Sequence, residues 1–239
     1  MRIVSDVLAY TDDNTALQAY VAYDAEIKGP MPTVLVCHAW AGRDGFVEAK
    51  ARQLAELGYL GVALDVYGEG VLGQTPEQNT KLMQPFMADR GKLRQRLLAG
   101  LEAAVSLSQV DRQRIAAIGF CFGGLCVLDL ARSGASLRGV VSFHGLLRAP
   151  EALANEAIQA KVLVLHGHDD PMVPVEDVVA LETELTEAGV DWQVHVYGQT
   201  LHAFTNPQAN DVDFGTVYQP DAERRSWQAM RHFLAEIFV

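Results

Sequence analysis

One short segment combines a reactive side chain with closely spaced glycines. It reads Gly119-Phe120-Cys121-Phe122-Gly123-Gly124 and lies between an apolar run and a stretch of helical periodicity. A strand-to-helix turn of this kind presents a nucleophile at a sharp bend that leaves no room for side chains on either side of it. We therefore expect crowding at Gly119 and Gly123, and a strained backbone that exposes the sulfur of Cys121. The N-terminus of the following helix would favour the thiolate, which is the attacking form.

Other interpretations of this turn are weaker. A nucleotide-binding loop would need the spacing G-x-G-x-x-G or a following lysine, and neither is present. The three cysteines are an odd number without metal-type spacing, so we expect a reducing compartment and no disulfide framework. Cys37 lies in an apolar run and Cys126 in a helical stretch, which is typical of core thiols.

A cysteine nucleophile needs a base, and the base needs an acid that orients it. In hydrolases built around this turn, the order along the chain is nucleophile, acid, histidine. The apolar run Val162–Leu165 leads to two adjacent aspartates, Asp169 and Asp170, and the run Trp192–Tyr197 leads to a loop that contains His202. We expect His202 to be the base. The residues alone do not decide between the two aspartates.

Other histidines have weaker claims to chemistry. His195 lies inside a predicted strand, where a structural role is favoured. His166 and His168 flank the acid loop and are expected to brace it. His38 and His144 each follow a predicted strand, so they can line a pocket, although a structural role is favoured for both.

The elements that position these residues alternate between strand and helix. After a hairpin of Ile3–Ala9 and Leu17–Tyr23, we expect strands at Pro32–Cys37, Leu60–Leu64, Ile115–Ile118, Val140–Phe143, Val162–Leu165 and, last, Trp192–Tyr197. Helices are expected at Phe46–Leu57, in two pieces within Pro76–Leu107 that break near Gly91, and at Leu125–Ala131, Val178–Glu187 and Arg224–Phe238. This alternation predicts a mostly parallel central sheet with helices on both faces, in a single domain over residues 1–239.

Composition excludes several classes of protein. Of the 239 residues, 49% are hydrophobic and 21% charged, which is typical of a globular chain with a large core. We find neither a secretory signal nor a segment apolar enough to cross a bilayer, so we expect a cytoplasmic protein without membrane association. The formal net charge of −11 would repel a phosphate backbone, so nucleic acid is not an expected partner.

The sequence resembles the dienelactone hydrolase (carboxymethylenebutenolidase-like) family of the α/β-hydrolases. The resemblance runs from the strand at Val34 to the helix at Trp227. Its sharpest motifs are the cysteine elbow, Asp170 followed by Val173-Pro174, and His202-Ala203-Phe204. It implies an α/β-hydrolase fold and a triad of Cys121, His202 and Asp170, because the Val-Pro pair lies at the family's distance from Asp170.

The resemblance also implies an oxyanion hole and a pocket. The segment Cys37–Gly42 matches the family's oxyanion loop, so the donors would be the backbone N–H groups of Trp40 and Phe122. Pocket candidates by this match are Ala39, Tyr67, Phe204 and Asn206, and His38 and His144 join them because each follows a predicted strand. Two positions depart from this pattern: family members typically have a glutamate at position 39, and those that act on dienelactone have an arginine at position 206. Without that arginine, we expect a dianionic lactone to bind poorly.

These observations predict a hydrolase of small esters or lactones that acts through a thioester and needs no cofactor. The histidines match no strong metal-ligand spacing, so no metal is expected. The expected partner is a small-molecule substrate, and the chain can be a monomer or a homodimer. Hydrolysis of aryl phosphotriesters is an alternative, as a main or promiscuous activity. A non-catalytic binding protein that keeps the fold is another.

Overall fold

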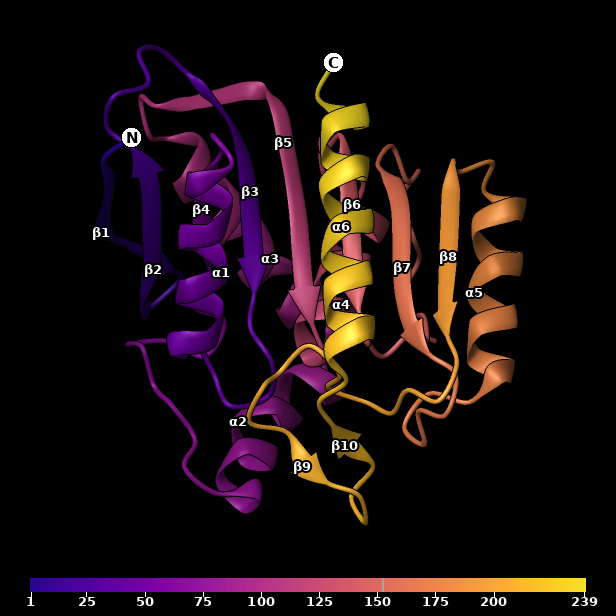
Figure 1. The fold of residues 1–239 in the computed structure, drawn as a ribbon. Helices are drawn as coiled ribbons and strands as arrows, with labels where there is room; N and C mark the ends of the chain where they lie inside the picture. Colours follow the sequence, from indigo (N-terminus) through magenta and orange to yellow (C-terminus); the bar gives the residue numbers. More distant parts are fainter. Residues whose placement is uncertain (152) are drawn as a thin grey trace. The chain divides into compact units, whose positions relative to one another are not determined.

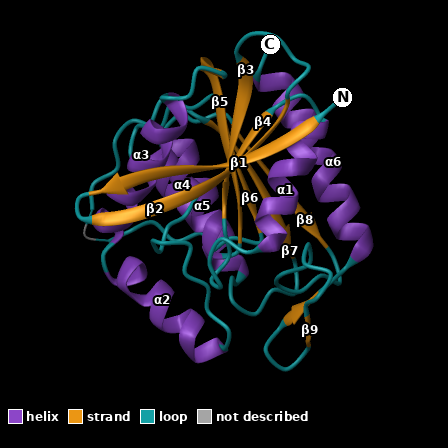
Figure 2. Ribbon diagram, turned by 90° about the vertical axis from the view of Figure 1, so that its left-hand side faces the viewer, coloured by secondary structure: helices purple, strands orange, loops and turns teal. Residues whose placement is uncertain are grey.

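The opening hairpin is longer than the sequence predicts. In the computed structural model, which describes residues 1–151 and 153–239, β1 (Ile3–Asp12) pairs antiparallel with β2 (Thr15–Asp24). The two strands lie side by side in Figure 2. Backbone pairing continues to Asp12 and Thr15, beyond the apolar alternation on which the prediction depended. The turn is therefore short, and Asp13 adopts a positive φ of 49° within it.

The chain forms two compact units, Met1–Ile118 and Gly119–Val239. Strands of the first unit follow the order β1-β2-β4-β3-β5. The bounds are Met31–Cys37 for β3, Leu60–Ala63 for β4, and Val110–Phe120 for β5, whose last two residues belong to the second unit. β4 is parallel to β3 and antiparallel to β2. The sequence predicted only the buried end of β5, because its first residues are polar.

Three helices accompany these strands: α1 (Gly45–Glu56), α2 (Pro76–Ala88) and α3 (Arg90–Val105). Figure 1 shows α1 in front of β3 and β4, and α3 behind them. The predicted break between α2 and α3 lies at Asp89, two residues before Gly91. The Asp89 side chain accepts a hydrogen bond from the Lys92 amide (2.9 Å) and so caps α3.

The second unit contains three neighbouring parallel strands, β6 (Gly139–Phe143), β7 (Lys161–Gly167) and β8 (Trp192–Tyr197). Its helices are α4 (Phe122–Arg132), α5 (Val175–Glu187) and α6 (Pro220–Ile237). In Figure 1, α6 lies in front of β6 and α4 behind it. The strands are thus mostly parallel, with helices on both sides, which confirms the predicted fold class.

One prediction about the strands is wrong. β8 is not the last strand, because β9 (Asn210–Asp211) and β10 (Thr216–Val217) follow it as an antiparallel pair. Two residues per strand are too few to produce a detectable alternation. Within the described residues, no helix is both long and apolar enough to span a membrane.

Candidate active site

Cys121 lies on a strained turn between β5 and α4. Its φ of 55° and ψ of −116° are uncommon for a residue with a side chain and cost on the order of 1–3 kcal/mol. A Cβ at Gly119 would lie 1.9 Å from the Gly123 carbonyl oxygen, which confirms the crowding predicted there. The thiol residue itself is partly exposed, whereas Cys37 and Cys126 are buried. Burial raises the pKa of Cys37 to about 12, as expected for an inert core thiol.

The structure brings His202 to Asp170. His202 Nδ1 lies 2.7 Å from Asp170 Oδ2, and both side chains are buried. The other carboxylate oxygen accepts the Met172 amide (2.9 Å), which fixes the orientation of the carboxylate. Asp169, by contrast, is exposed. Of the two aspartates, only Asp170 therefore has the contact that an orienting acid requires.

The surroundings of His202 favour its charged form. Burial alone would lower its pKa, but the charge of Cys121 and the hydrogen bond to Asp170 outweigh burial and raise the pKa to about 10. His202 Nε2 is buried, and Cys121 also raises the pKa of His202 through a side-chain hydrogen bond. One nitrogen is thus held by a carboxylate, and the other is left for proton transfer.

A short segment missed by the sequence analysis holds the backbone of His202. The His202 amide donates to the Gly215 carbonyl (3.0 Å), and the Val217 amide donates to the His202 carbonyl (3.0 Å). Gly215 has a φ of 79°, and a Cβ there would lie 2.2 Å from Cγ of Pro171, the residue after the acid. The β9–β10 segment therefore packs against the acid loop and the base loop at once.

His144 lies at the end of β6 beside the same residues. Its Nδ1 accepts the Cys121 amide (3.1 Å), and its Nε2 lies 2.8 Å from Thr205 Oγ1. Its ring meets the rings of His202 and Phe204 edge-on, at centroid distances of 5.1 and 5.0 Å. Phe204 is fully buried. Thr205 carries no sequence signal, because its contact joins residues 61 positions apart.

Asn206, a predicted pocket residue, lies in the loop after the base. Its side-chain Oδ1 accepts the Gln208 amide (3.0 Å), so it caps the loop after the base. The side chain is half-buried. An amide in this position offers no positive charge to a substrate carboxylate.

The first unit holds the remaining pocket candidates in two adjoining loops. His38 is fully buried; its Nε2 accepts the Val66 amide (3.2 Å) and its Nδ1 lies 2.6 Å from the Ala39 carbonyl. The Tyr67 hydroxyl donates to the Trp40 carbonyl (2.9 Å). Ala39, Trp40 and Tyr67 are each half-buried. The structure thus joins the predicted oxyanion loop to the predicted pocket wall through hydrogen bonds within this unit.

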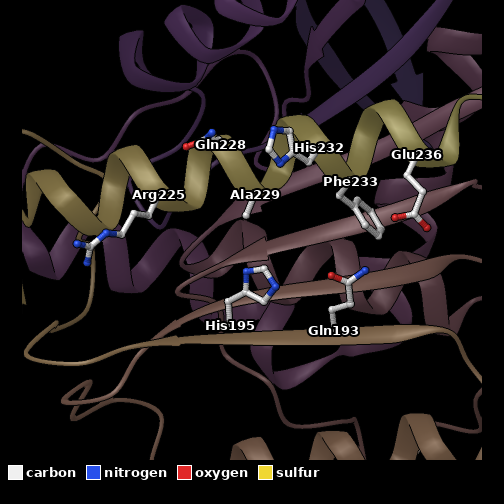
Figure 3. Close-up of a pocket in the computed structure, with 8 residues that line it drawn as sticks. All are labelled: Gln193, His195, Arg225, Gln228, Ala229, His232, Phe233 and Glu236. Atoms are coloured by element: carbon white, nitrogen blue, oxygen red, sulfur yellow. The ribbon is translucent and has the colours of Figure 1, made fainter.

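Of the other histidines, His166 is within electrostatic range of the acid–base pair, because Asp170 and His202 both act on it. His166 is buried in β7, and burial lowers its pKa; His168 is exposed. His195 lines a surface groove of about 360 Å³ between β8 and α6 (Figure 3). This groove also contains His232, which the sequence analysis did not weigh. The residues lining it, none of them a predicted catalytic residue, are Gln193, His195, Arg225, Gln228, Ala229, His232, Phe233 and Glu236.

Comparison with known proteins identifies the relatives of this chain. The model of the dienelactone hydrolase family matches residues 17–238. The chain belongs to the dienelactone hydrolase family. An uncharacterized protein of Caenorhabditis elegans is 39% identical over 152 residues, which make up 62% of this chain and 96% of that protein.

Solved structures of dienelactone hydrolase-like proteins share the whole fold. P91, a dienelactone hydrolase-like promiscuous phosphotriesterase from metagenomic libraries, is 37% identical, with a TM-score of 0.95 and full coverage of both chains. A structure named m3DLH is 40% identical, with a TM-score of 0.94 and 99% of each chain covered. Membership of the dienelactone hydrolase family supports hydrolase activity on esters or lactones and implies a small-molecule substrate.

Proposed function

We propose that this protein hydrolyses small, uncharged esters or lactones, with Cys121 as nucleophile, His202 as base and Asp170 as the acid that orients it. The observation that carries the proposal is the state of His202. Asp170 holds its Nδ1, its Nε2 is buried, and Cys121 raises its pKa through both its charge and a side-chain hydrogen bond. This is the arrangement that a thiolate–imidazolium pair needs.

The reaction would proceed in two steps that share one base. The Cys121 thiolate attacks the carbonyl carbon and forms a tetrahedral oxyanion. Collapse of this intermediate breaks the bond to the alkoxide, which takes a proton from the His202 imidazolium and leaves a thioester. Neutral His202 then removes a proton from water, whose oxygen attacks the thioester. The second collapse releases the carboxylic acid and regenerates the thiolate.

The backbone amide of Phe122 is the oxyanion donor proposed for the second unit. Phe122 is the first residue of α4. The N–H groups in the first turn of a helix have no partner inside the helix and face outward at its N-terminus, where they can stabilise negative charge. A fixed donor of this kind is worth roughly 10²- to 10³-fold in kcat. The Trp40 amide, as the other donor, is proposed from the resemblance to the family.

The preference for uncharged substrates follows from Asn206. A dicarboxylate substrate would lose its binding cation there, because the Asn206 side chain is neutral and already caps the loop. We expect Asn206→Arg to lower the KM for a carboxylate-bearing lactone by about tenfold or more, the scale of a charged hydrogen bond. The KM for p-nitrophenyl acetate should change little. Asn210→Arg, at an exposed position on β9, is the matched control. An equal change in both variants would contradict a specific role for position 206.

Cys121→Ala tests the nucleophile most directly. We expect hydrolysis of p-nitrophenyl acetate to disappear, while Cys126→Ala, which removes a buried thiol, should retain it. Mass spectrometry of the acid-quenched enzyme should find an acyl group on the Cys121 peptide. Turnover by Cys121→Ala at the wild-type rate would overturn the proposal.

Hydrolysis of aryl phosphotriesters is a second candidate, favoured by the similarity to P91. Diethyl p-nitrophenyl phosphate and p-nitrophenyl butyrate release the same chromophore, so they can be assayed in parallel. If Cys121 serves both reactions, Cys121→Ala should abolish both. Loss of the esterase activity alone would mean that another group acts on phosphorus.

We also propose that residues 1–239 act as one domain of a cytoplasmic monomer or homodimer. The boundary between the two compact units along the chain falls inside the strand β5. Calorimetry should then show a single unfolding transition. Two separate transitions would contradict a single domain.

A further inference from the structure

His144 touches the nucleophile turn on one side and the base loop on the other. Its Nδ1 is 3.1 Å from the Cys121 backbone nitrogen, and its Nε2 is 2.8 Å from the Thr205 hydroxyl. Both side chains are almost fully buried, with 3% of His144 and 2% of Thr205 exposed. Thr205 follows the base, His202, by three residues. One imidazole therefore links the backbone of the nucleophile to the loop of the base.

These contacts fix the tautomer of His144. A backbone N–H can only donate, so Nδ1 must accept and carries no proton. The ring proton is then on Nε2, which donates to Thr205 Oγ1. If Nδ1 carried a proton, its N–H group would face the backbone N–H of Cys121, and neither could accept a hydrogen bond. The arrangement requires a neutral imidazole, in contrast to His202.

The backbone of both His144 and Cys121 adopts a conformation that residues with side chains rarely adopt. His144 has a φ of 38°, and Cys121, whose amide it binds, has a φ of 55°. Such conformations persist only where surrounding contacts over-determine them. The Cys121 amide also donates to the Phe143 carbonyl (3.0 Å), so two successive residues share in holding this turn.

We propose that His144 is a positioning residue that sets the placement of Cys121 relative to His202, with Thr205 fixing the ring. This inference rests on the proposed function. His144 is not a second base, because both of its nitrogens are engaged and Asp170 pairs with His202 instead. A shift of about 1 Å between reacting groups can cost on the order of 100-fold in rate. Loss of either hydrogen bond should therefore slow the chemical step.

Thr205→Val is the cleanest variant, because it removes the hydroxyl and keeps the shape. We expect kcat for p-nitrophenyl acetate to fall about 10- to 100-fold with KM within about twofold, and alkylation of Cys121 by iodoacetamide to slow in parallel. Thr205→Ser, which keeps the hydroxyl, should restore kcat to within about threefold. Thr33→Val is the control, because Thr33 is also buried and donates only to the Met31 carbonyl.

His144 is tested by two substitutions that differ in one acceptor. Asparagine tolerates positive φ and places Oδ1 near the position of Nδ1, whereas leucine offers no acceptor. We expect His144→Asn to exceed His144→Leu in kcat by about tenfold or more. Nitrogen NMR of the wild type should show an unprotonated Nδ1. If His144→Leu does not fold, the kinetics of Thr205→Val and Thr205→Ser and the tautomer seen by NMR still test the role of His144.

Two results separate this inference from the proposed function. A folded Thr205→Val variant with wild-type kcat and wild-type alkylation rate would overturn the role of His144. If Cys121→Ala is inactive in the same experiments, the proposed triad still stands. An active Cys121→Ala would overturn the proposed function itself. Equal losses in Thr205→Val and Thr33→Val would show a general packing effect and would also overturn the inference.

Discussion

His38 and His202 are both buried and both follow strands, but their surroundings differ. His38 follows β3 in the first unit, and both of its ring nitrogens contact backbone groups of its own and the neighbouring loop. His202 follows β8 in the second unit, with one nitrogen on a carboxylate and the other making no hydrogen bond to a backbone group of the described residues. Burial lowers the pKa of His38, whereas neighbouring charges raise that of His202 despite burial.

The nearby aspartates differ in the same way. Asp65, in the first unit, accepts the backbone amides of Gln18, Gly68 and Gly70. Asp170 gives one oxygen to a backbone amide and the other to an imidazole. A buried histidine or aspartate whose atoms all meet backbone groups holds loops together. A buried histidine or aspartate that uses one of its polar atoms to contact another titratable side chain can take part in proton transfer.

The largest expected effect comes from replacing each histidine by alanine. His202→Ala should reduce kcat for p-nitrophenyl acetate about 10⁴-fold or more, as for other triad members. His38→Ala should instead reduce the free energy of unfolding by about 1–3 kcal/mol, because it leaves the Val66 amide buried without its acceptor. Steady-state kinetics and urea unfolding of both variants measure this contrast. Equal kinetic losses would end the distinction.

The aspartates provide the next contrast. Asp170→Asn should reduce kcat about 10³- to 10⁴-fold, because an amide cannot stabilise the imidazolium. Asp65→Asn turns one acceptor into a donor that faces backbone N–H groups, so its main effect should be a loss of stability of about 1–3 kcal/mol. The same two assays apply. A stable, fully active Asp170→Asn would contradict the role of the acid.

The sequence predicted the strands well where burial produced a pattern. β3 differs from its predicted bounds by one residue, because a continuous apolar run marks both faces of a buried strand. β8 matches its predicted bounds although none of its residues is buried, because its apolar and polar residues alternate. The hairpin β1–β2 was predicted too short, because pairing between polar residues leaves no hydrophobic signal. The pair β9–β10 was missed because each strand has two residues.

The site was predictable at the level of motifs but not of contacts. The cysteine turn is local, so its glycine spacing was visible. The choice between Asp169 and Asp170 depended on resemblance, since adjacent residues share one loop and differ only in which of them turns inward. The contacts of His144 depend on where β6 ends relative to the cysteine turn, and no spacing within the chain gives that relation.

The β9–β10 segment holds the backbone of His202, and Gly215→Ala tests its role. A methyl group there would meet Cγ of Pro171 at 2.2 Å and would also disfavour the φ of 79°. We expect the acid loop to shift and kcat to fall about 10- to 100-fold. Gly189→Ala is the control, because Gly189 has a similar φ of 68° but nothing within 4 Å of the added carbon. If kcat falls equally in Gly215→Ala and Gly189→Ala, backbone strain alone explains the effect, and the contact with Pro171 does not.

The smallest expected effect is on stability as a function of pH, where the two histidines should act in opposite directions. His202 has a folded pKa of about 10, above its ordinary 6.5, so its contribution to stability is complete below pH 6.5 and is lost as the pH rises through 10. The folded pKa of His38 lies below 6.5, so its protonation in the unfolded chain reduces stability as the pH falls below 6.5. Urea unfolding from pH 5 to 10 should therefore show a smaller alkaline loss in His202→Asn and a smaller acid loss in His38→Asn. The alkaline effect should also shrink in Cys121→Ala, because the charge of Cys121 is part of what raises the pKa of His202. An unchanged alkaline profile in both His202→Asn and Cys121→Ala would mean that these two side chains do not form an ion pair.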